Sequence, residues 1–165
     1  METFAVRMAG EMHLPTAIPF IIAKLKESGE DGEWLTEECD TALGKIGGDT
    51  TIAAVADMFR QGEWYLRMDA CSVLQHIHSD LVVDTALELL SSEENTTVRA
   101  FLVDGLLSHF AFDAIEPIRQ IVLDGKYDKT DADLKRGLVV AAMLMGVKFP
   151  EREQWKAEVE QKRLE

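Results

Sequence analysis

Residues 66–90 read LRMDACSVLQHIHSDLVVDTALELL, and the apolar pattern of this stretch decides the fold. Its first part carries apolar side chains three or four residues apart, at Leu66, Ala70, Val73, Leu74 and Ile77. After a short break the same spacing returns, at Val83, Ala86, Leu87 and Leu90. This spacing places side chains on one face of an α-helix. The stretch therefore predicts two consecutive helices, each with one apolar face.

The two-helix pattern recurs along the chain at a nearly constant period. The first helices align over residues 8–12, 42–46, 73–77 and 105–109. The same offsets align the second helices, whose shared apolar column begins with Ile18, Ile52, Val83 and Ile115. A fixed period of this length is typical of repeat proteins, in which each hairpin buries its apolar faces against its neighbours.

Extending the pattern over the whole chain predicts ten helices, at residues 3–12, 15–28, 33–46, 49–61, 64–77, 80–92, 96–109, 113–124, 131–146 and 150–163. They pair into five hairpins, over about residues 1–30, 31–62, 63–94, 95–127 and 128–163. No segment shows the alternating pattern of a strand. We therefore expect an all-α protein with one domain over residues 1–163, folded as a right-handed α–α superhelix, or solenoid.

Residues that favour helix ends support these boundaries. Carboxylates that can cap the second helices stand at Asp49, Asp80 and Asp113. Glycines that favour a left-handed backbone follow the second helices, at Gly29, Gly62 and Gly125. Pro15 suits a first helical turn.

Four residues depart from the repeat or stand out within it. Pro117 is predicted about one turn inside its helix, where it would remove a backbone hydrogen bond. His109 occupies a column that is otherwise aliphatic, as an interior histidine bonded to a loop carbonyl or as a pH-sensitive one. Trp34 and Trp64 begin successive first helices. We expect them to pack between hairpins; the alternative is a partner-binding rim.

The chain resembles a known repeat family at several of these helices. Residues 41–49 read TALGKIGGD, while Val98-Arg99-Ala100 and Leu66-Arg67 open later helices. These motifs resemble the HEAT-like repeat of bacterial and archaeal proteins, a type also found in phycobilisome lyases. The resemblance covers nearly the whole chain and is strongest over residues 33–123. It implies a HEAT- or armadillo-like solenoid whose second helices line a concave, partner-binding side.

The excess of acidic over basic residues limits the classes of partner that the protein can bind. The 165 residues include 30 Asp and Glu against 17 Lys and Arg, a net charge of −13. Of these, 21 acidic and 8 basic residues lie in residues 1–120. Such an excess repels nucleic acids and anionic membranes. The second helices offer few basic residues for a phosphate backbone, chiefly Lys24, Arg60 and Arg119. We therefore predict a protein or peptide partner, with a basic segment favoured.

Acidic residues recur at outward positions of the second helices. Neighbouring helices pack about 10 Å apart, so four carboxylates are expected to form an acidic ladder on the concave side: Asp57, Asp84, Glu88 and Glu116. The alternative is that these residues are only the solvated face of an acidic protein. The acidic pairs Glu37-Glu38 and Glu93-Glu94 are expected to be exposed.

No catalytic, cofactor-binding or metal-binding pattern is found. The sequence has no nucleophile elbow, phosphate-binding glycine loop or dinucleotide fingerprint. His76 and His78 do not have a ligand spacing, and no His-Glu dipeptide occurs. We expect no catalytic residues, no cofactor and no metal, and Cys39 and Cys71 read as buried free thiols. Enzymatic activity is left open but not favoured.

These observations favour a non-catalytic scaffold or regulatory module that binds its partner on the acidic ladder. The alternative, which rests on the resemblance, is a lyase or lyase accessory similar to the phycobilin-attaching HEAT-like proteins. The sequence indicates a cytoplasmic protein without a signal peptide, and we expect a monomer. Leu164-Glu165 resembles the junction that precedes a purification tag.

Overall fold

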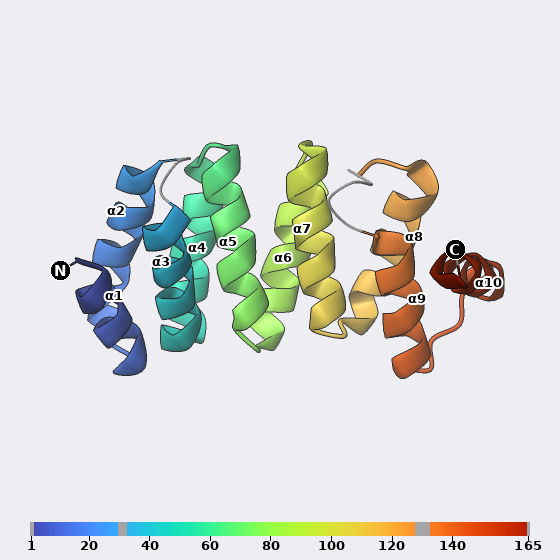
Figure 1. Ribbon diagram of the computed structural model, residues 1–165, viewed down its shortest axis with the longest axis horizontal. Coiled ribbons are helices and arrows are strands. Elements are labelled where there is room, and N and C mark those ends of the chain that lie inside the picture. The colour runs from blue at the N-terminus through green and yellow to red at the C-terminus, as the bar shows by residue number, and fades with distance from the viewer. Residues whose placement is uncertain (1, 30–32, 128–132, 165) are drawn as a thin grey trace. The chain divides into compact units, whose positions relative to one another are not determined.

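The computed structural model describes residues 2–29, 33–127 and 133–164, and these ranges contain only helices, turns and loops (Figure 1). Their helices are α1 (Glu2–Glu11), η1 (Pro15–Ala17), α2 (Ile18–Ser28), α3 (Glu33–Ile46), α4 (Gly48–Gln61), α5 (Trp64–His76), α6 (Asp80–Ser92), α7 (Thr96–Ser108), η2 (Phe112–Ala114), α8 (Ile115–Asp124), α9 (Leu134–Leu144) and α10 (Arg152–Leu164), where η denotes a short 3-10 helix. The predicted all-α class is confirmed.

Most predicted boundaries lie within two residues of the observed ones. Two predicted second helices begin instead with a 3-10 turn, at η1 and η2. The helix expected over residues 131–146 is observed as Leu134–Leu144, while residues 131 and 132 lie outside the described part of the chain. Leu164 ends α10, and Glu165 lies outside the described residues as well.

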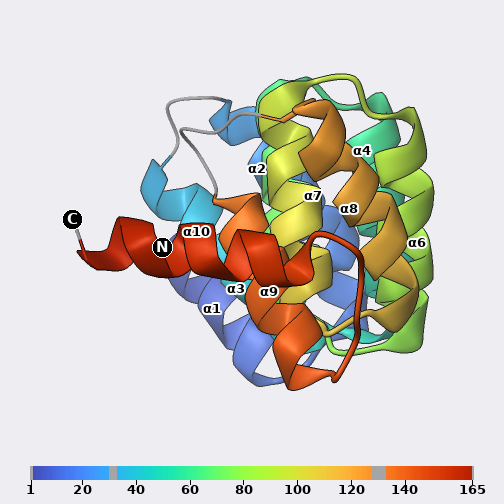
Figure 2. The same ribbon diagram turned by 90° about the vertical axis from the view of Figure 1, so that its right-hand side faces the viewer.

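The chain divides into two compact units, Met1–Glu93 and Glu94–Glu165, and each is described by itself. In the first unit, α1 contacts α3 and α3 contacts α5, while α2 contacts α4 and α4 contacts α6. Figures 1 and 2 show these as two rows of helices, with α2, α4 and α6 together on one side. In the second unit, α9 contacts α7, α8 and α10. The single domain over residues 1–163 stays a prediction, because an array of repeats can contain more than one compact unit.

Neighbouring helices of the first unit meet at an offset that matches the sequence period. A Cβ built on Gly10 of α1 would lie 2.8 Å from Ala42 Cα of α3. A Cβ built on Gly44 of α3 would lie 2.9 Å from His76 Cβ of α5. The members of each pair are 32 residues apart along the chain (42 − 10 and 76 − 44), within two residues of the repeat steps of 34 (42 − 8) and 31 (73 − 42). Glycine therefore leaves room for the close approach of α1 to α3 and of α3 to α5.

The core follows the apolar columns of the sequence. In the first unit the largest fully buried side chains include Ile21, Leu25, Leu43, Ile52 and Met58. In the second unit they are Leu106, Ile118, Leu134 and Leu138. The most deeply buried side chains of each unit therefore come from first and second helices alike.

The predicted helix-end signals are partly wrong. The α6 helix is capped by the Ser79 side chain, which accepts a hydrogen bond from the Leu81 N–H at 3.2 Å, and Asp80 lies in the first turn. Gly62 has an extended backbone with φ −88°, not a left-handed one. It is small for another reason, since a Cβ there would lie 2.7 Å from the Met58 carbonyl oxygen. Gly125 adopts the predicted left-handed conformation, with φ 67°.

Pro117 differs from expectation, whereas both interpretations of His109 stay predictions. Pro117 is the third residue of α8, in the first turn, where backbone N–H groups have no helical acceptor. The predicted loss of a hydrogen bond inside the helix is therefore wrong. His109 follows the last residue of α7 and is half-buried, with its backbone N–H donating to the Gly105 carbonyl at 3.1 Å.

The prediction for the cysteines is confirmed, and the one for Trp34 is wrong. Cys39 and Cys71 are free thiols and are buried. Burial, followed by the negative charge of Asp40, raises the pKa of Cys39 to about 12, which keeps the thiol un-ionised at neutral pH. Trp34, expected to pack between hairpins, is 69% exposed. No helix within the described ranges has both the length and the apolar content that a bilayer crossing requires.

Candidate functional site

Three residues of the predicted acidic ladder lie in the first unit. Asp57 lies on α4, and Asp84 and Glu88 lie one turn apart on α6, which packs against α4. The apolar positions of α4 that face the core, among them Ile52, Val55, Ala56 and Phe59, leave Asp57 on the opposite side, in solvent. All three carboxylates are exposed. We call the surface formed by Asp57, Asp84, Glu88 and Arg60 the α4–α6 face.

Arg60 links the two helices of this face. Its Nη1 donates to Asp57 Oδ1 at 3.1 Å, and its Nη2 donates to Glu88 Oε1 at 2.9 Å. The arginine side chain is 44% exposed, and its two partners are more exposed still. Hydrogen bonding to Glu88, and then that carboxylate's charge, raises the pKa of Arg60. The α4–α6 face thus carries three carboxylates and one guanidinium.

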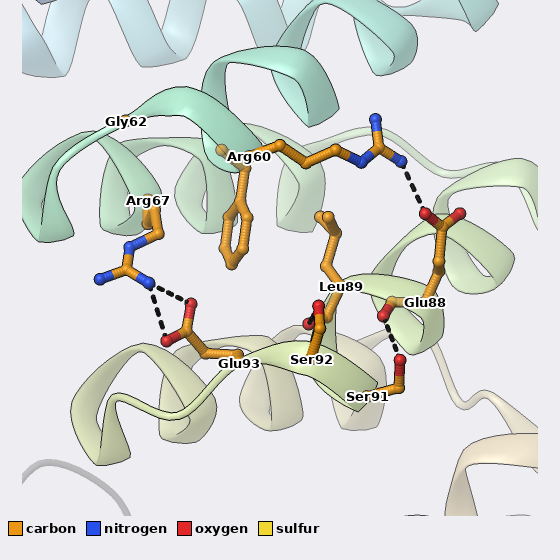
Figure 3. A pocket seen from close by; sticks show the side chains of 9 residues that line it. Arg60, Gly62, Arg67, Glu88, Leu89, Ser91, Ser92 and Glu93 are labelled. Atoms are coloured by element: carbon orange, nitrogen blue, oxygen red, sulfur yellow. Dashed lines mark hydrogen bonds and ion pairs between the residues drawn. The ribbon is translucent and has the colours of Figure 1, made fainter.

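A pocket of about 450 Å³ lies beside the α4–α6 face (Figure 3). It is formed by the end of α4, the loop before α5, the start of α5 and the last turn of α6. Figure 3 shows the Arg60–Glu88 pair at one side and the Arg67–Glu93 pair at the other, with Leu89 between them. The hydroxyls of Ser91 and Ser92 donate to backbone carbonyls of α6.

The Arg67–Glu93 pair is the less exposed of the two. Arg67 Nη1 donates to Glu93 Oε1 at 2.9 Å and to Oε2 at 2.8 Å. The Glu93 side chain is 1% exposed, so the expectation that Glu93 is exposed is wrong. Arg67 Nε is buried without a hydrogen-bond partner. The pair ties the start of α5 to the end of α6, a contact that no local sequence pattern indicates.

The fourth ladder residue, Glu116, belongs to the second unit. It is exposed on α8, where Arg119 Nη1 donates to Glu116 Oε1 at 2.7 Å and Gln120 Nε2 donates to it at 2.8 Å. The hydrogen bond from Gln120, followed by that from Arg119, lowers the pKa of Glu116. Arg119 also donates from Nε and Nη2 to Glu151, at 2.7 Å in both cases.

The three basic residues singled out on the second helices, Lys24, Arg60 and Arg119, all have carboxylate partners. Besides Arg60 and Arg119, Lys24 Nζ lies 3.0 Å from Glu2 Oε1 and 2.7 Å from Glu27 Oε2. Each predicted cation is therefore engaged by at least two acidic side chains. Among these pairs, those of Arg60 are well exposed on both sides, and a charged partner can exchange with them at little cost.

Asp40 and Asp69 form a second acidic group, which the sequence pattern did not predict. Asp40 on α3 is 8% exposed, and the Ser72 side chain of α5 hydrogen-bonds to its carboxylate. Burial and the negative charge of Asp69 raise the pKa of Asp40 to about 8, and burial raises that of Asp69 to about 6. The signal was present: Asp40 stands three residues before Leu43 and four before Gly44, on the face that meets α5.

The described part of the chain brings together no cluster of three or more His, Cys, Asp or Glu that could hold a metal ion. Comparisons with protein-family models, with curated proteins and with solved structures found no match to this chain.

Proposed function

We propose that this protein is an interaction module and that its first unit binds a basic segment of another protein on the α4–α6 face. The observation that carries the proposal is the set of three exposed carboxylates, Asp57, Asp84 and Glu88, on two adjacent helices beside a pocket. The sequence of this unit contains 17 acidic and 6 basic residues, a net charge of −11. Charge of one sign steers an oppositely charged partner and excludes others.

Arg60 occupies the place that a partner's cation would take. Exposed ion pairs contribute about 0–1 kcal/mol each, so a Lys or Arg of the partner can replace Arg60 at Asp57 or Glu88 without a large cost. The released guanidinium then returns to solvent. Binding of this kind depends on exposed charges, and it therefore weakens as salt screens them.

The helical hairpins are proposed to be HEAT-like repeats of one right-handed superhelix. Support comes from the offset at which Gly10 meets Ala42 and Gly44 meets His76, 32 residues in both cases (42 − 10 and 76 − 44), which is close to the repeat steps of 34 (42 − 8) and 31 residues (73 − 42). In such an array the row of α2, α4 and α6 is the partner-binding side. This is the side on which the α4–α6 face lies.

A peptide-binding experiment tests the function. A fluorescent lysine- and arginine-rich peptide, and its glutamate counterpart, are titrated with the protein and followed by anisotropy. We expect the basic peptide alone to bind, and Asp57→Lys combined with Glu88→Lys to weaken binding by about tenfold or more, which corresponds to about 1.4 kcal/mol. Raising the salt concentration severalfold should weaken it further.

The matched control changes the net charge equally at exposed positions away from the face. Glu37→Lys on α3 combined with Glu160→Lys on α10 serves this purpose, since both residues are exposed. If this control weakens binding as much as the face variant does, the attraction is general and the α4–α6 face is not the site. Equal binding of the basic and acidic peptides removes the proposal altogether.

A further inference from the structure

The contact between α3 and α5 contains a carboxyl group that the proposed function does not use. Asp40 is more than nine-tenths buried, and its Oδ1 has no hydrogen-bond partner. The carboxylate is hydrogen-bonded by the Ser72 side chain, from α5. An ionised carboxylate in such a place loses its hydration without receiving a compensating positive charge.

The charged groups around Asp40 do not supply that compensation. On α5, Asp69 adds a second negative charge, and His76 lies one turn beyond Ser72, with its Nδ1 2.7 Å from the Ser72 carbonyl oxygen. On α2, Lys24 is held by Glu2 and Glu27.

On α1, the helix on the other side of α3, the charged side chains are engaged in pairs. Arg7 is paired with Glu38, and Glu11 is paired with Lys45. Among the described residues, the only side chains that shift the Asp40 pKa are Asp69, which raises it, and Ser72, which lowers it.

Solvent does not reach Asp40 Oδ1, which is buried without a hydrogen-bond partner. One turn beyond the Asp40–Ser72 contact, Gly44 meets His76 so closely that an added Cβ would lie 2.9 Å from His76 Cβ. The two contacts share the same sequence offset, so α3 and α5 run side by side in register. Hydration of Asp40 Oδ1 therefore requires the packing of α3 against α5 to loosen locally.

We propose that the α3–α5 contact is a pH-sensitive element of the first unit, closed while Asp40 carries a proton and opened locally when Asp40 ionises. The proton on Asp40 neutralises a carboxylate that no nearby cation neutralises. When it leaves, the two carboxylates of Asp40 and Asp69 repel each other within a poorly hydrated contact. The helices then separate far enough to admit water.

The pKa values place this change near neutral pH. With the ordinary value of 3.8 in the open, hydrated form and about 8 in the closed form, opening becomes easier as the pH rises between these limits, and levels off above them. Release of one proton changes the equilibrium constant for opening by at most about tenfold per pH unit. The proposal does not depend on partner binding.

Cys39, next to Asp40 and fully buried, reports the opening. Its alkylation by N-ethylmaleimide is measured by peptide mapping in the full chain, from about pH 5.5 to about pH 8.5, in the native protein and in Asp40→Asn. The ratio of the two rates cancels the ionisation of the thiol itself. We expect this ratio to rise at least tenfold between about pH 6 and about pH 8 and then to level off.

A second variant, a control variant and added calcium chloride complete the test. Asp69→Asn removes the repulsion that raises the Asp40 pKa, so the rise should be smaller and level off at a lower pH. Asp49→Asn, at an exposed position on α4, should behave as the native protein does. A ratio that does not change with pH overturns the proposal, as does an Asp69→Asn curve that matches the native one. The measurement is repeated in millimolar calcium chloride. If the rise in the alkylation ratio disappears there, a metal ion occupies the place between the Asp40 and Asp69 carboxylates, and the proposal is overturned.

Discussion

Arg67 holds Glu93 through one nitrogen, since its Nη1 donates to both carboxylate oxygens, at 2.9 and 2.8 Å. Glu93 immediately follows α6, and Arg67 lies in the first turn of α5. The pair therefore fastens the end of the third hairpin to its beginning. Because the Glu93 side chain is almost fully buried and the Arg67 side chain is 28% exposed, solvent screens this pair less than the Arg60 pairs.

Glu93→Gln should destabilise the first unit. The variant keeps the shape of the side chain but leaves the Arg67 guanidinium, partly buried, without a charged partner. Breaking a fully buried pair costs about 3–5 kcal/mol, and the partial exposure of Arg67 lowers our expectation to about 1–3 kcal/mol. Urea unfolding followed by circular dichroism measures the loss. The matched control is Glu88→Gln, whose exposed pair with Arg60 should cost less than about 1 kcal/mol. Equal losses in the two variants would show that burial of Glu93 does not matter.

Gly10→Ala should also destabilise the first unit, although alanine favours helices. The new Cβ would lie 2.8 Å from Ala42 Cα, a backbone atom that cannot move without displacing α3. Overpacking of this kind costs about 1–3 kcal/mol, which exceeds the gain of about 1 kcal/mol in helix propensity. Thermal unfolding should show a lower midpoint.

Gly137→Ala is the control for this effect. Its Cβ would meet only Leu107 Cδ1, at 2.9 Å, and that methyl group can rotate away. The midpoint should therefore stay unchanged or rise. If Gly10→Ala is as well tolerated as Gly137→Ala, the close approach of α1 and α3 is not a constraint on the sequence.

The helices could be predicted because their signal is local. The apolar spacing around Leu66 and Val73 gave residues 64–77, and α5 is observed at Trp64–His76. Glu93 could not be predicted, because its burial depends on Arg67, which lies far earlier in the chain and meets it only when α5 and α6 pack. The glycine at residue 62 was recognised as a helix end, but its extended backbone was not, since the constraint comes from the Met58 carbonyl.

The sequence predicted which residues of the acidic ladder are exposed, but not the ion pairs that they form. Helical periodicity placed Asp57 and Glu88 outward, and both are exposed. Their shared contact with Arg60 depends on side-chain conformations across two helices, which a sequence period does not determine. The same limit applies to Asp40, whose raised pKa follows from the closeness of α5 and not from its immediate neighbours in the sequence.

Stability should fall as the pH rises from about 4 towards about 8, and Asp40 is the main reason. The closed form binds the Asp40 proton with a pKa of about 8, whereas the unfolded chain releases it near 3.8. A raised carboxyl pKa stabilises the folded state fully below 3.8, and this contribution is lost as the pH rises through the interval. One such group gives a slope of at most about 1.4 kcal/mol per pH unit.

Asp40→Asn should therefore remove most of this slope between about pH 6 and about pH 8 in urea unfolding measured at a series of pH values, whereas Asp69, whose burial raises its pKa to about 6, adds a slope of its own below that pH. Carboxylates with lowered pKa values, such as Glu38 beside Arg7 and Glu151 beside Arg119, act in the opposite direction. Their contribution is lost only as the pH falls below the ordinary glutamate value of 4.5. An Asp40→Asn slope equal to that of the native protein would assign the alkaline loss to other groups.

Arg60→Ala should strengthen binding of a basic peptide. This prediction tests whether Arg60 competes with the partner's cations on the α4–α6 face. Removal of the guanidinium leaves Asp57 and Glu88 without their shared partner, so an incoming lysine or arginine no longer competes with it. We expect binding to tighten severalfold, within the range of about 0.2–1 kcal/mol measured for exposed pairs. Lys26→Ala on α2 removes the same charge at an exposed position away from the face. Anisotropy titrations of both variants separate the two effects. Equal tightening would trace the gain to net charge, whereas tightening confined to Arg60→Ala would place the partner's cations at Asp57 and Glu88.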